Sequence, residues 1–339
     1  FKMGMLIDPF NRRITYLRIS VTDRCNLRCR YCMPDIHINF LPRDKILSFE
    51  EIEAIVRVMA RLGVKSLRLT GGEPTVRTGI VELVARLKAV PGIEEIAMTT
   101  NGMLLSKLAK PLKAAGLDRI NISLDTLKPE RFKFITQFGD FGAVWEGILA
   151  AEEAGLEPIK LNVVVMKGVN DDEVVELAAL TLGHPWHVRF IEWMPFGEDG
   201  AEVYRIGSIA NAFMPLSLVK ARLEDAYGPL EPAEAEVKGQ GPARSFKIRG
   251  AKATIGFISP ITEEHFCARC NKVRLTSDGK LRLCLLTDHE VELMGPLRRG
   301  IDEAGLEALL RAAIQTKPER HLVNEGIIPN LRRMIQIGG

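Results

Sequence analysis

The sequence predicts an α/β protein built as an incomplete (β/α)6 barrel of the TIM type, open on one side. Short β-rich runs alternate with helical patterns over the first two thirds of the chain, which is typical of a parallel sheet with helices packed outside it. Six such units are fewer than a closed eight-stranded barrel needs. Unusual residues follow several different strands, as in barrel enzymes, and this favours the barrel over a doubly wound open sheet.

The six units are predicted from apolar runs followed by amphipathic segments. Strands are expected at residues 16–20, 66–70, 95–100, 119–124, 159–166 and 187–194. Helices are expected at residues 48–63, 79–90, 105–115, 143–154, 172–182 and 216–227. Ser48 with Glu51 three residues later predicts a capping box at the start of the first helix. Gly116 predicts the end of the third helix.

The pattern changes near residue 245, so we predict a barrel domain over residues 1–244 and a C-terminal region over residues 245–339. This region is too small to be an enzyme by itself and is expected to close the open side of the barrel. The expected elements are an antiparallel pair at 245–249 and 253–259, a hairpin at 272–284 that turns at Asp278-Gly279, a helix at 302–315, and an irregular end.

Composition limits the classes of function. The net charge of +3 is too small to argue for a nucleic-acid surface, but it is compatible with an anionic substrate in a basic pocket. No apolar run approaches the roughly 20 residues that span a bilayer, and the N-terminus turns polar at Asn11-Arg12-Arg13, so we expect no membrane span and a cytoplasmic protein. The six cysteines fall into two groups of three, which in a cytosolic chain favours metal binding over disulfides.

The first group, Cys25, Cys29 and Cys32, has the spacing C-x3-C-x2-C. Structural zinc sites usually have four ligands, and a disulfide framework uses an even number of cysteines. Three clustered thiolates suit a four-iron cluster in which one iron stays open for another ligand. The alternatives are a chance cluster of cysteines or a zinc site short of one ligand.

The second group, Cys267, Cys270 and Cys284, has the spacing C-x2-C-x13-C. A zinc ribbon begins in the same way but needs a fourth ligand, and His289 is the only candidate shortly after Cys284. The other interpretation is a second four-iron cluster, again with an open iron.

Gly71-Gly72-Glu73-Pro74 follows the second predicted strand. Glycines let the backbone approach a ligand closely, although this segment by itself is also typical of an ordinary turn. Together with the first cysteine group and the aromatic Tyr31 before its third cysteine, the segment resembles the radical S-adenosylmethionine (radical SAM) superfamily. The resemblance implies that the incomplete barrel is of the radical SAM type.

Over nearly its whole length the chain resembles one family of that superfamily, molybdenum cofactor biosynthesis protein A, the GTP 3′,8-cyclases. The resemblance rests on LRISVTDRC at 17–25, RLTGGEP at 68–74, TTNG at 99–102, NISLD at 121–125, KLN at 160–162 leading to GVN at 168–170, RFIEWMP at 189–195, GPAR at 241–244 and the terminal Gly338-Gly339.

The resemblance implies the roles of individual residues. Catalytic Cys25, Cys29 and Cys32 would hold one 4Fe-4S cluster, and Cys267, Cys270 and Cys284 a second. S-Adenosylmethionine (SAM) would contact Tyr31, Gly72, Ser123 and Met194. GTP would contact Arg18, Arg68, Thr99, Lys160, Lys272, Val273 and Arg274, and the tail Gly338-Gly339 would reach the active site.

Three of these assignments have their own basis. Thr99 is chosen over Thr100 because it keeps the family's spacing from Gly72 to Ser123. Lys272 stands where the family commonly has arginine, so it keeps the charge and loses the bidentate fork. Arg18 and Arg68 lie inside apolar β-runs, where a buried cation needs an anionic partner, such as a triphosphate.

The activity that the resemblance implies is a radical lyase reaction, the first step of molybdopterin biosynthesis. A 5′-deoxyadenosyl radical takes the ribose 3′ hydrogen of GTP, and (8S)-3′,8-cyclo-7,8-dihydroguanosine 5′-triphosphate is formed. An external electron donor, cyclic pyranopterin monophosphate synthase as the recipient of the product, and a possible homodimer are the implied partners. Two alternatives stay open: a radical SAM enzyme with an auxiliary cluster that acts on a peptide, and a non-enzymatic zinc protein.

Overall fold

The computed structural model describes residues 4–33, 38–194, 212–233, 241–329 and 332–338. One twelve-stranded sheet runs through them in the order β12-β11-β10-β1-β2-β3-β4-β5-β6-β9-β8-β7. Its strands are β1 (Tyr16–Ser20), β2 (Ser66–Thr70), β3 (Glu95–Thr100), β4 (Arg119–Ser123), β5 (Lys160–Val165), β6 (His187–Glu192), β7 (Glu231–Pro232), β8 (Arg244–Lys247), β9 (Ile255–Ile258), β10 (Lys272–Leu275), β11 (Lys280–Arg282) and β12 (Glu290–Glu292).

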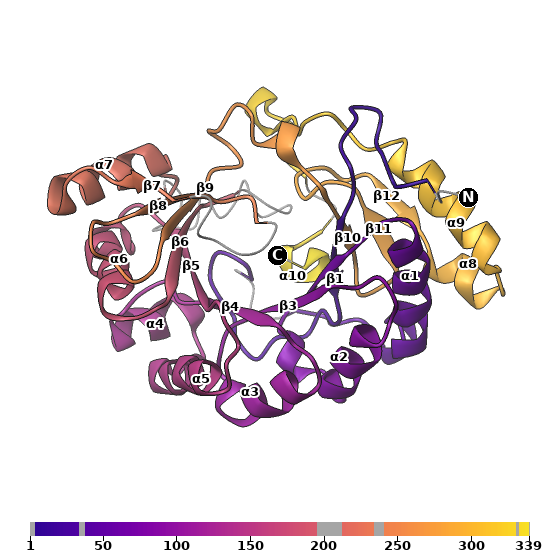
Figure 1. The fold of residues 1–339 in the computed structure, drawn as a ribbon, viewed down its shortest axis with the longest axis horizontal. Helices are drawn as coiled ribbons and strands as arrows, with labels where there is room; N and C mark the ends of the chain where they lie inside the picture. Colours follow the sequence, from indigo (N-terminus) through magenta and orange to yellow (C-terminus); the bar gives the residue numbers. More distant parts are fainter. Residues whose placement is uncertain (1–3, 34–37, 195–211, 234–240, 330–331, 339) are drawn as a thin grey trace.

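Most of the helices lie on the outer side of this curved sheet (Figure 1). They are α1 (Phe49–Arg61), α2 (Ile80–Lys88), α3 (Leu105–Ala114), α4 (Pro129–Thr136), α5 (Phe141–Glu153), α6 (Val174–Gly183), α7 (Leu216–Tyr227), α8 (Met294–Arg298), α9 (Glu303–Ile314) and α10 (Met334–Ile337). None of the described helices is both long and apolar enough to cross a membrane.

The predicted α/β architecture is confirmed, because β1 to β6 pair in chain order and in parallel. Strands of a parallel sheet covered by helices are buried on both faces, and all five residues of β2 are buried. The predicted capping box is also present at the start of α1. Ser48 Oγ accepts from the Glu51 amide at 3.2 Å, and Glu51 Oε2 accepts from the Ser48 amide at 2.7 Å.

The C-terminal region extends both edges of the six-stranded core. Strand β10 pairs in parallel with β1, and β9 pairs in parallel with β6. The two predicted antiparallel pairs are confirmed as β8 with β9 and β10 with β11. Since β9 and β10 lie at opposite edges, the loop of residues 259–271 between them crosses the open side of the barrel (Figure 1). The division into domains at residue 244 stays a prediction.

Several elements differ from the sequence prediction. The end of the chain, expected to be irregular, contains the short helix α10. Helix α4 is not among the predicted elements, and neither are α8, β7 and β12. These elements are too short for an apolar period to repeat, so no pattern marks them.

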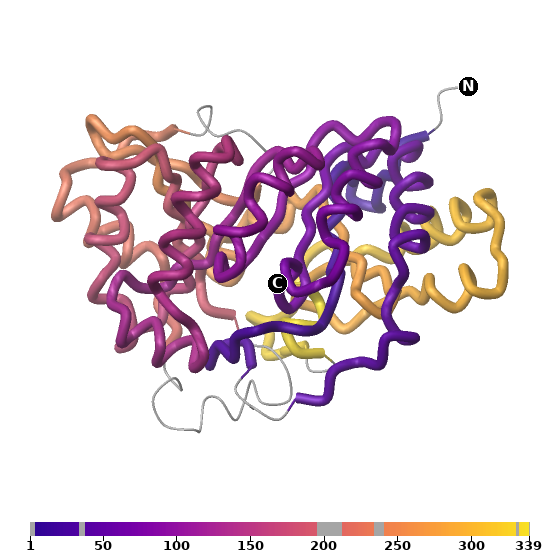
Figure 2. The backbone as a smooth tube through the Cα atoms, turned by 90° about the horizontal axis from the view of Figure 1, so that it is seen from below, coloured from indigo at the N-terminus to yellow at the C-terminus, as the bar shows by residue number. Residues whose placement is uncertain are grey.

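Segments from the two halves of the chain lie side by side at two places in the molecule. Helix α9 packs next to α1, where Arg61 and Glu303 form an ion pair of 2.7 Å. Helix α10 lies in the middle of the curved sheet, and the C-terminal segment ends there close to the N-terminal strand β1 (Figures 1 and 2). Residues from both ends of the sequence are therefore available to one site.

Candidate active site

The interior of the barrel holds a cavity of about 470 Å³, which is lined by residues at the carboxyl ends of the strands and by the C-terminal region. Both predicted cysteine groups line it, and so do all four predicted SAM residues. The predicted GTP residues that line it are Arg18, Arg68, Thr99, Lys272 and Arg274. Lys160 is buried in the wall behind the lining, and Val273 lies in the apolar core with its side chain on the other face of β10.

The first cysteine group forms a tight loop after β1. The amides of Cys32 and Met33 both donate to the carbonyl oxygen of Cys29, at 2.9 and 2.7 Å. Burial raises the pKa of Cys25 to about 11 and the pKa of Cys32 to about 12, and in Cys32 the neighbouring Cys25 adds to the effect. Thiolates buried this close together require a positive charge, and iron supplies one. The donor set therefore fits an iron–sulfur cluster.

The glycine pair after β2 holds this loop by direct backbone contact. The Gly72 amide donates to Thr22 O at 2.7 Å, and the Glu73 amide donates to Arg24 O at 2.8 Å. A Cβ atom on Gly72 would lie 2.4 Å from Arg24 O, closer than any real contact allows. The glycine is therefore required for the close approach of β2 to the cysteine loop.

Tyr31 points at the end of β4. Its hydroxyl donates to Asp125 Oδ2 at 2.9 Å, and Asp125 Oδ1 accepts from the Val164 amide at 2.8 Å. Burial raises the pKa of Asp125 to about 6, against the lowering effect of these hydrogen bonds. Ser123 and Met194 line the same side of the cavity.

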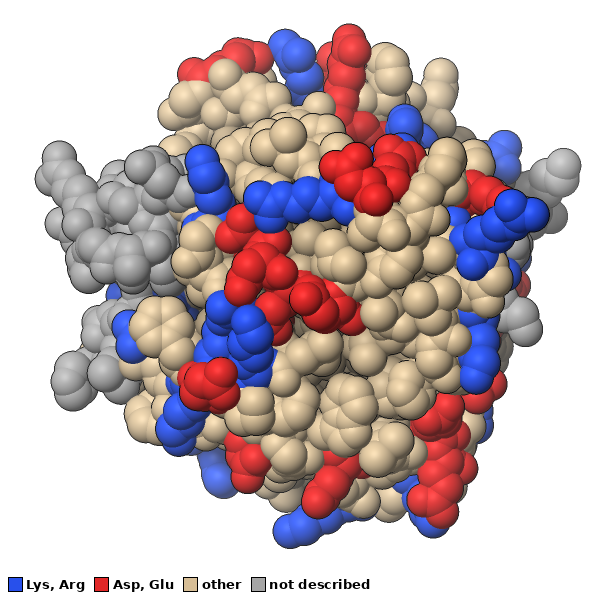
Figure 3. Space-filling model, turned by 90° about the vertical axis from the view of Figure 1, so that its left-hand side faces the viewer, with Lys and Arg blue, Asp and Glu red and all other residues tan. Residues whose placement is uncertain are grey.

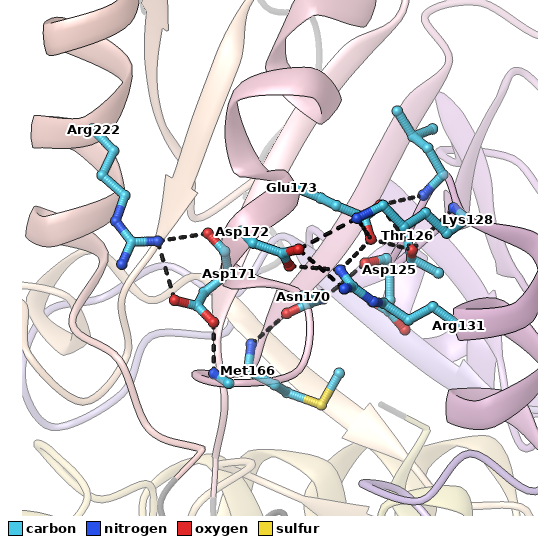
Figure 4. Close-up of polar contacts among 12 residues, drawn as sticks. Asp125, Thr126, Lys128, Arg131, Met166, Asn170, Asp171, Asp172, Glu173 and Arg222 are labelled. Carbon is cyan, nitrogen blue, oxygen red and sulfur yellow. Dashed lines mark hydrogen bonds and ion pairs between the residues drawn. The ribbon is translucent and has the colours of Figure 1, made fainter.

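A polar network fixes the loop that carries Asp125 (Figure 4). Asn170 Nδ2 donates to Asp125 O at 2.7 Å, and Asn170 Oδ1 accepts from the Met166 amide at 2.7 Å. Beside them Thr126 donates to the buried Glu173 at 2.7 Å, and Arg131 bonds to Glu173 as well. The ends of β4 and β5 are thereby held in one position relative to the cavity.

The second cysteine group is formed by two segments of the chain. One is the loop that crosses the open side of the barrel, and the other follows β11. Cys267 and Cys270 lie in the crossing loop, where the Cys270 amide donates to Cys267 O at 3.1 Å, and Cys284 follows β11. Burial raises the pKa of Cys284, whereas in Cys270 the effect of burial is outweighed by the charges of Lys317 and Lys272, so that its pKa falls. All six cysteines are free thiols.

His289, the possible fourth zinc ligand, bonds through Nε2 to Thr316 Oγ1 at 2.8 Å and does not line the cavity. Within the described residues, no three His, Cys, Asp or Glu side chains are arranged to ligate one metal ion. Three cysteines of a four-iron cluster bind three different iron atoms and need not converge on one point.

A row of three arginines crosses the neighbouring strands β10, β1 and β2. Arg18 lies opposite Arg274 on one side and opposite Arg68 on the other. Like charges directly opposite each other in a sheet are destabilising, and burial adds to the cost. Burial, together with the neighbouring arginines, holds the pKa of Arg18 well below its usual value and lowers the pKa of Arg274 to about 10. We call these three residues the arginine row.

Tyr16 lies beside the arginine row, two residues before Arg18 in β1 and opposite Lys272 in β10. Its hydroxyl accepts a hydrogen bond from Arg68 Nε, and Arg68 Nη1 donates to Thr99 Oγ1 at 3.2 Å. Burial raises the pKa of Tyr16, but the charges of Arg68, Arg18 and Arg119 outweigh it and bring the pKa to about 8. Thr100 instead donates to Glu73 at 2.6 Å, so of the two threonines Thr99 is the one in contact with the row.

Two more basic side chains, Lys160 and Arg189, come from β5 and β6. Burial has the largest effect on Lys160 and, with the charges of Arg189, Arg119 and Arg68, lowers its pKa to about 6. Burial lowers the pKa of Arg189 to about 9. Arg189 donates to Asn162 Oδ1 at 2.6 Å from Nη2. Arg189 and Asn162 line the cavity but are not among the predicted site residues, although Arg189 interrupts an apolar β-run as Arg18 does.

The tail reaches this cluster of cations. Met334 and Ile335 of α10 line the cavity, and Gly338 O accepts from Arg274 Nη1 at 2.7 Å and from Arg18 Nη2 at 3.5 Å. Gly338 has a φ of 76°, in the left-handed region that favours glycine. Gly339 lies outside the described residues.

Charge is distributed differently outside and inside the molecule. The outer face on the left of Figure 1 carries cationic and anionic side chains next to each other (Figure 3). In the cavity, the carboxylates among the described lining residues are Glu73 and Asp125, and both lie near the first cysteine group. The arginine row and the second cysteine group therefore form a strongly cationic half of the cavity, which suits an anion of several charges.

Comparison with known proteins identifies the family. Residues 19–181 match the Radical SAM superfamily model, and residues 186–323 match the model named Molybdenum Cofactor Synthesis C. The chain is 49% identical to a GTP 3′,8-cyclase of Pelotomaculum thermopropionicum over 332 residues, covering 98% of this chain and 99% of the relative. It is 50% identical to a GTP 3′,8-cyclase of Heliobacterium modesticaldum over 335 residues, covering 98% of this chain and 100% of the relative.

Solved structures support the fold. Streptococcus suis SuiB bound to S-adenosylmethionine superposes with a TM-score of 0.58 at 16% identity, covering 87% of this chain and 68% of that chain. SuiB bound to the precursor peptide SuiA gives a TM-score of 0.59 at 18% identity, covering 81% and 61%. At such identities the likeness concerns the fold alone, whereas the sequence relatives match almost end to end. The chain therefore belongs to the radical SAM superfamily and, within it, to the GTP 3′,8-cyclase family.

Proposed function

We propose that this protein converts GTP into (8S)-3′,8-cyclo-7,8-dihydroguanosine 5′-triphosphate, the first step of molybdenum cofactor biosynthesis. The observation that carries the proposal is the combination, in one cavity, of two three-cysteine groups and the arginine row Arg18, Arg68 and Arg274. Thiols suit iron–sulfur clusters, and opposed buried arginines suit a triphosphate. An external electron donor, a synthase that consumes the product, a cytoplasmic location and a possible homodimer belong to the same proposal.

The first cysteine group is the proposed site of radical formation. Cys25, Cys29 and Cys32 would hold a 4Fe-4S cluster, which together with SAM supplies the 5′-deoxyadenosyl radical that takes the 3′ hydrogen of the ribose. The chain's own contribution is position. The backbone hydrogen bonds from Gly72 to Thr22 and from Glu73 to Arg24 fix the cysteine loop, and the hydrogen bond from Tyr31 to Asp125 fixes the side of the loop that faces β4.

The arginine row is the proposed triphosphate site. Its guanidinium groups present planar donors from three neighbouring strands, and each contact replaces a repulsion between cations with an attraction to phosphate. Lys160 in β5 and Arg189 in β6 lie near them, since the charge of Arg68 helps to lower the pKa of both side chains. Because the pKa of Lys160 is about 6 in the ligand-free cavity, we propose that this amine takes up a proton when the anion binds.

The second cysteine group is the proposed site of the guanine end. Cys270 and Cys284 flank Lys272 and Arg274 in the sequence and line the same cavity, so a base next to these cysteines leaves the triphosphate within the cationic half. Cys267, Cys270 and Cys284 would hold a second 4Fe-4S cluster with one open coordination position. Val273 points into the core, so its proposed part in binding is through the backbone.

The test is anaerobic reconstitution with iron and sulfide, followed by addition of reductant, SAM and GTP and analysis by mass spectrometry. We expect 5′-deoxyadenosine and a GTP-derived cyclic product. Cys25→Ser should abolish both, whereas Cys270→Ser should keep some 5′-deoxyadenosine and lose the product. Guanosine in place of GTP is the matched control and should give little product.

Three outcomes would contradict parts of the proposal. Formation of 5′-deoxyadenosine with no change in GTP would direct attention to another substrate, such as a peptide. Zinc at the second cysteine group in anaerobically purified protein would remove the second cluster. Equal turnover of guanosine and GTP would remove the triphosphate site.

A further inference from the structure

A buried lysine lies directly behind the second cysteine group. Lys317 follows α9 and is 3% exposed. Its Nζ donates to the carbonyl oxygen of Lys272 at 3.2 Å and to the carbonyl oxygen of Leu283. Lys272 comes two residues after Cys270, and Leu283 immediately precedes Cys284. One ammonium group therefore joins the two backbone segments that carry these cysteines.

Arg12 holds the segment around Lys317 next to Cys267, the remaining cysteine of the group. Arg12 donates from Nη1 to Cys267 O at 3.0 Å and to Glu319 O at 2.7 Å, and from Nη2 to Pro318 O at 2.6 Å. Arg12 is in turn paired with the buried Asp8 at 2.6 Å. Arg12 thus links residues 318 and 319 to the backbone of Cys267, and Lys317 connects the backbone segments next to Cys270 and Cys284.

Lys317 also brings a charge that protein groups do not cancel. Among the described residues its Nζ contacts carbonyl oxygens and forms no ion pair with a carboxylate. A cation in such a buried place acts strongly on its surroundings, because little water screens it.

We propose that Lys317 is a positioning residue of the second cysteine group, which holds Cys270 and Cys284 at the spacing of the cluster and stabilises the reduced form of that cluster by its positive charge. This inference rests on the proposed function, because it assumes that the second group holds a 4Fe-4S cluster. Net charge and hydrogen bonding around a cluster set its reduction potential. A reduced cluster carries one more negative charge, so a fixed cation beside it raises the potential.

The test uses the full chain with Cys25, Cys29 and Cys32 replaced by serine, so that only the second group can take up iron. Two properties are measured after reconstitution: the iron and sulfide content, and the midpoint potential from a redox titration followed by electron paramagnetic resonance. Lys317→Gln keeps hydrogen-bond donors and removes the charge, Lys317→Met removes both, and Lys317→Arg keeps the charge. Lys110→Met is the matched control, because it removes the same unit of charge from an exposed position on α3.

We expect a lower midpoint potential in Lys317→Gln and Lys317→Met and an unchanged potential in Lys110→Met. We also expect Lys317→Met to lose more iron than Lys317→Gln. A parental potential in both neutral variants would overturn the role of the charge. If both neutral variants fail to hold iron, Lys317→Arg decides: retention of the cluster at the parental potential supports the proposal, and loss of the cluster overturns it.

Failure of the proposed function gives a different result. In that case the parent with its three serines holds zinc or no iron, and no paramagnetic reduced cluster is seen before any change at Lys317.

Discussion

Arg18 and Arg274 lie opposite each other in the parallel strands β1 and β10, and both guanidinium groups donate to the carbonyl oxygen of Gly338. A carbonyl oxygen carries only part of a negative charge, so it relieves the repulsion between the two cations incompletely. An anion bound between the two guanidinium groups would relieve this repulsion further, and this is the basis of anion binding here.

Arg68→Ala should weaken GTP binding much more than SAM binding. The side chain donates to Tyr16 and Thr99 and belongs to the arginine row, so its removal loses one charged contact to phosphate. Such a contact is worth about 1.5–3 kcal/mol. Titration calorimetry with GTP, guanosine and SAM measures the effect, and Arg57→Ala on the exposed face of α1 is the control. An intact enzyme that binds guanosine as tightly as GTP would contradict the assignment.

GTP binding near pH 7.5 should be accompanied by proton uptake at Lys160. Burial and the neighbouring arginines lower its pKa to about 6, so the amine is mainly neutral before a phosphate arrives and charged afterwards. Calorimetry in buffers of different ionisation enthalpy counts the protons taken up. Lys160→Met should reduce the count, and an identical count in the variant would place the proton elsewhere.

The same lysine should make stability depend on pH. Its folded-state pKa lies below its unfolded value, so the unfolded chain binds more protons between about pH 6 and pH 10.5, and the cost of burying it shrinks as pH rises through that window. Denaturant unfolding should find Lys160→Met more stable than the parent, most of all at pH 6, with the gap closing at higher pH. A gap that does not change with pH would show that packing alone separates the two proteins.

Gly338→Ala should uncouple radical formation from product formation. The new Cβ would lie 2.8 Å from Thr70 Cγ2 and 3.1 Å from Ser20 Cβ, and the φ of 76° is unfavourable for alanine. The carbonyl contact to Arg274 would then be lost or displaced. We expect iron content and GTP affinity close to the parent, continued 5′-deoxyadenosine formation and a collapse of product yield. Deletion of Gly338-Gly339 should do the same, and full product yield from the truncated chain would mean that the tail has no part in the reaction.

Gly72→Ala should damage the first cysteine group. Its Cβ would meet Arg24 O at 2.4 Å and Asp23 O at 2.7 Å, so either the cysteine loop or the end of β2 must move. Reconstituted Gly72→Ala should hold less iron and cleave less SAM. Gly183→Ala, at the end of α6 with nothing near its Cβ, is the matched control. Equal iron content in the two variants would show that the loop adapts.

The sequence allows the fold to be predicted where a pattern repeats. The six β/α units are marked by apolar runs, whereas α4 and α10 are too short to show a period. The parallel pairing of β9 with β6 and of β10 with β1 has no local signature, because these partners are far apart in the sequence and only the fold brings them together.

The site follows a similar rule. Arg18 and Arg68 are predicted because a cation inside an apolar β-run needs a partner, and Arg189 carries the same signal. Lys317 carries no such signal, because its contacts are to carbonyl oxygens of residues that only the fold brings near. Contacts made by the main chain leave no trace in the pattern of side chains.

The parallel pairing of β1 with β10 has a consequence for folding during synthesis on the ribosome. Strand β1 is made long before β10, one of its two neighbours, because more than two hundred residues separate them in the sequence. Until then its edge stays unpaired, and exposed strand edges invite wrong partners. The arginine row is likewise incomplete in a growing chain, because Arg274 arrives late. A nascent chain thus cannot complete its anion site, or pair both edges of β1, until Arg274 and the rest of β10 have been made.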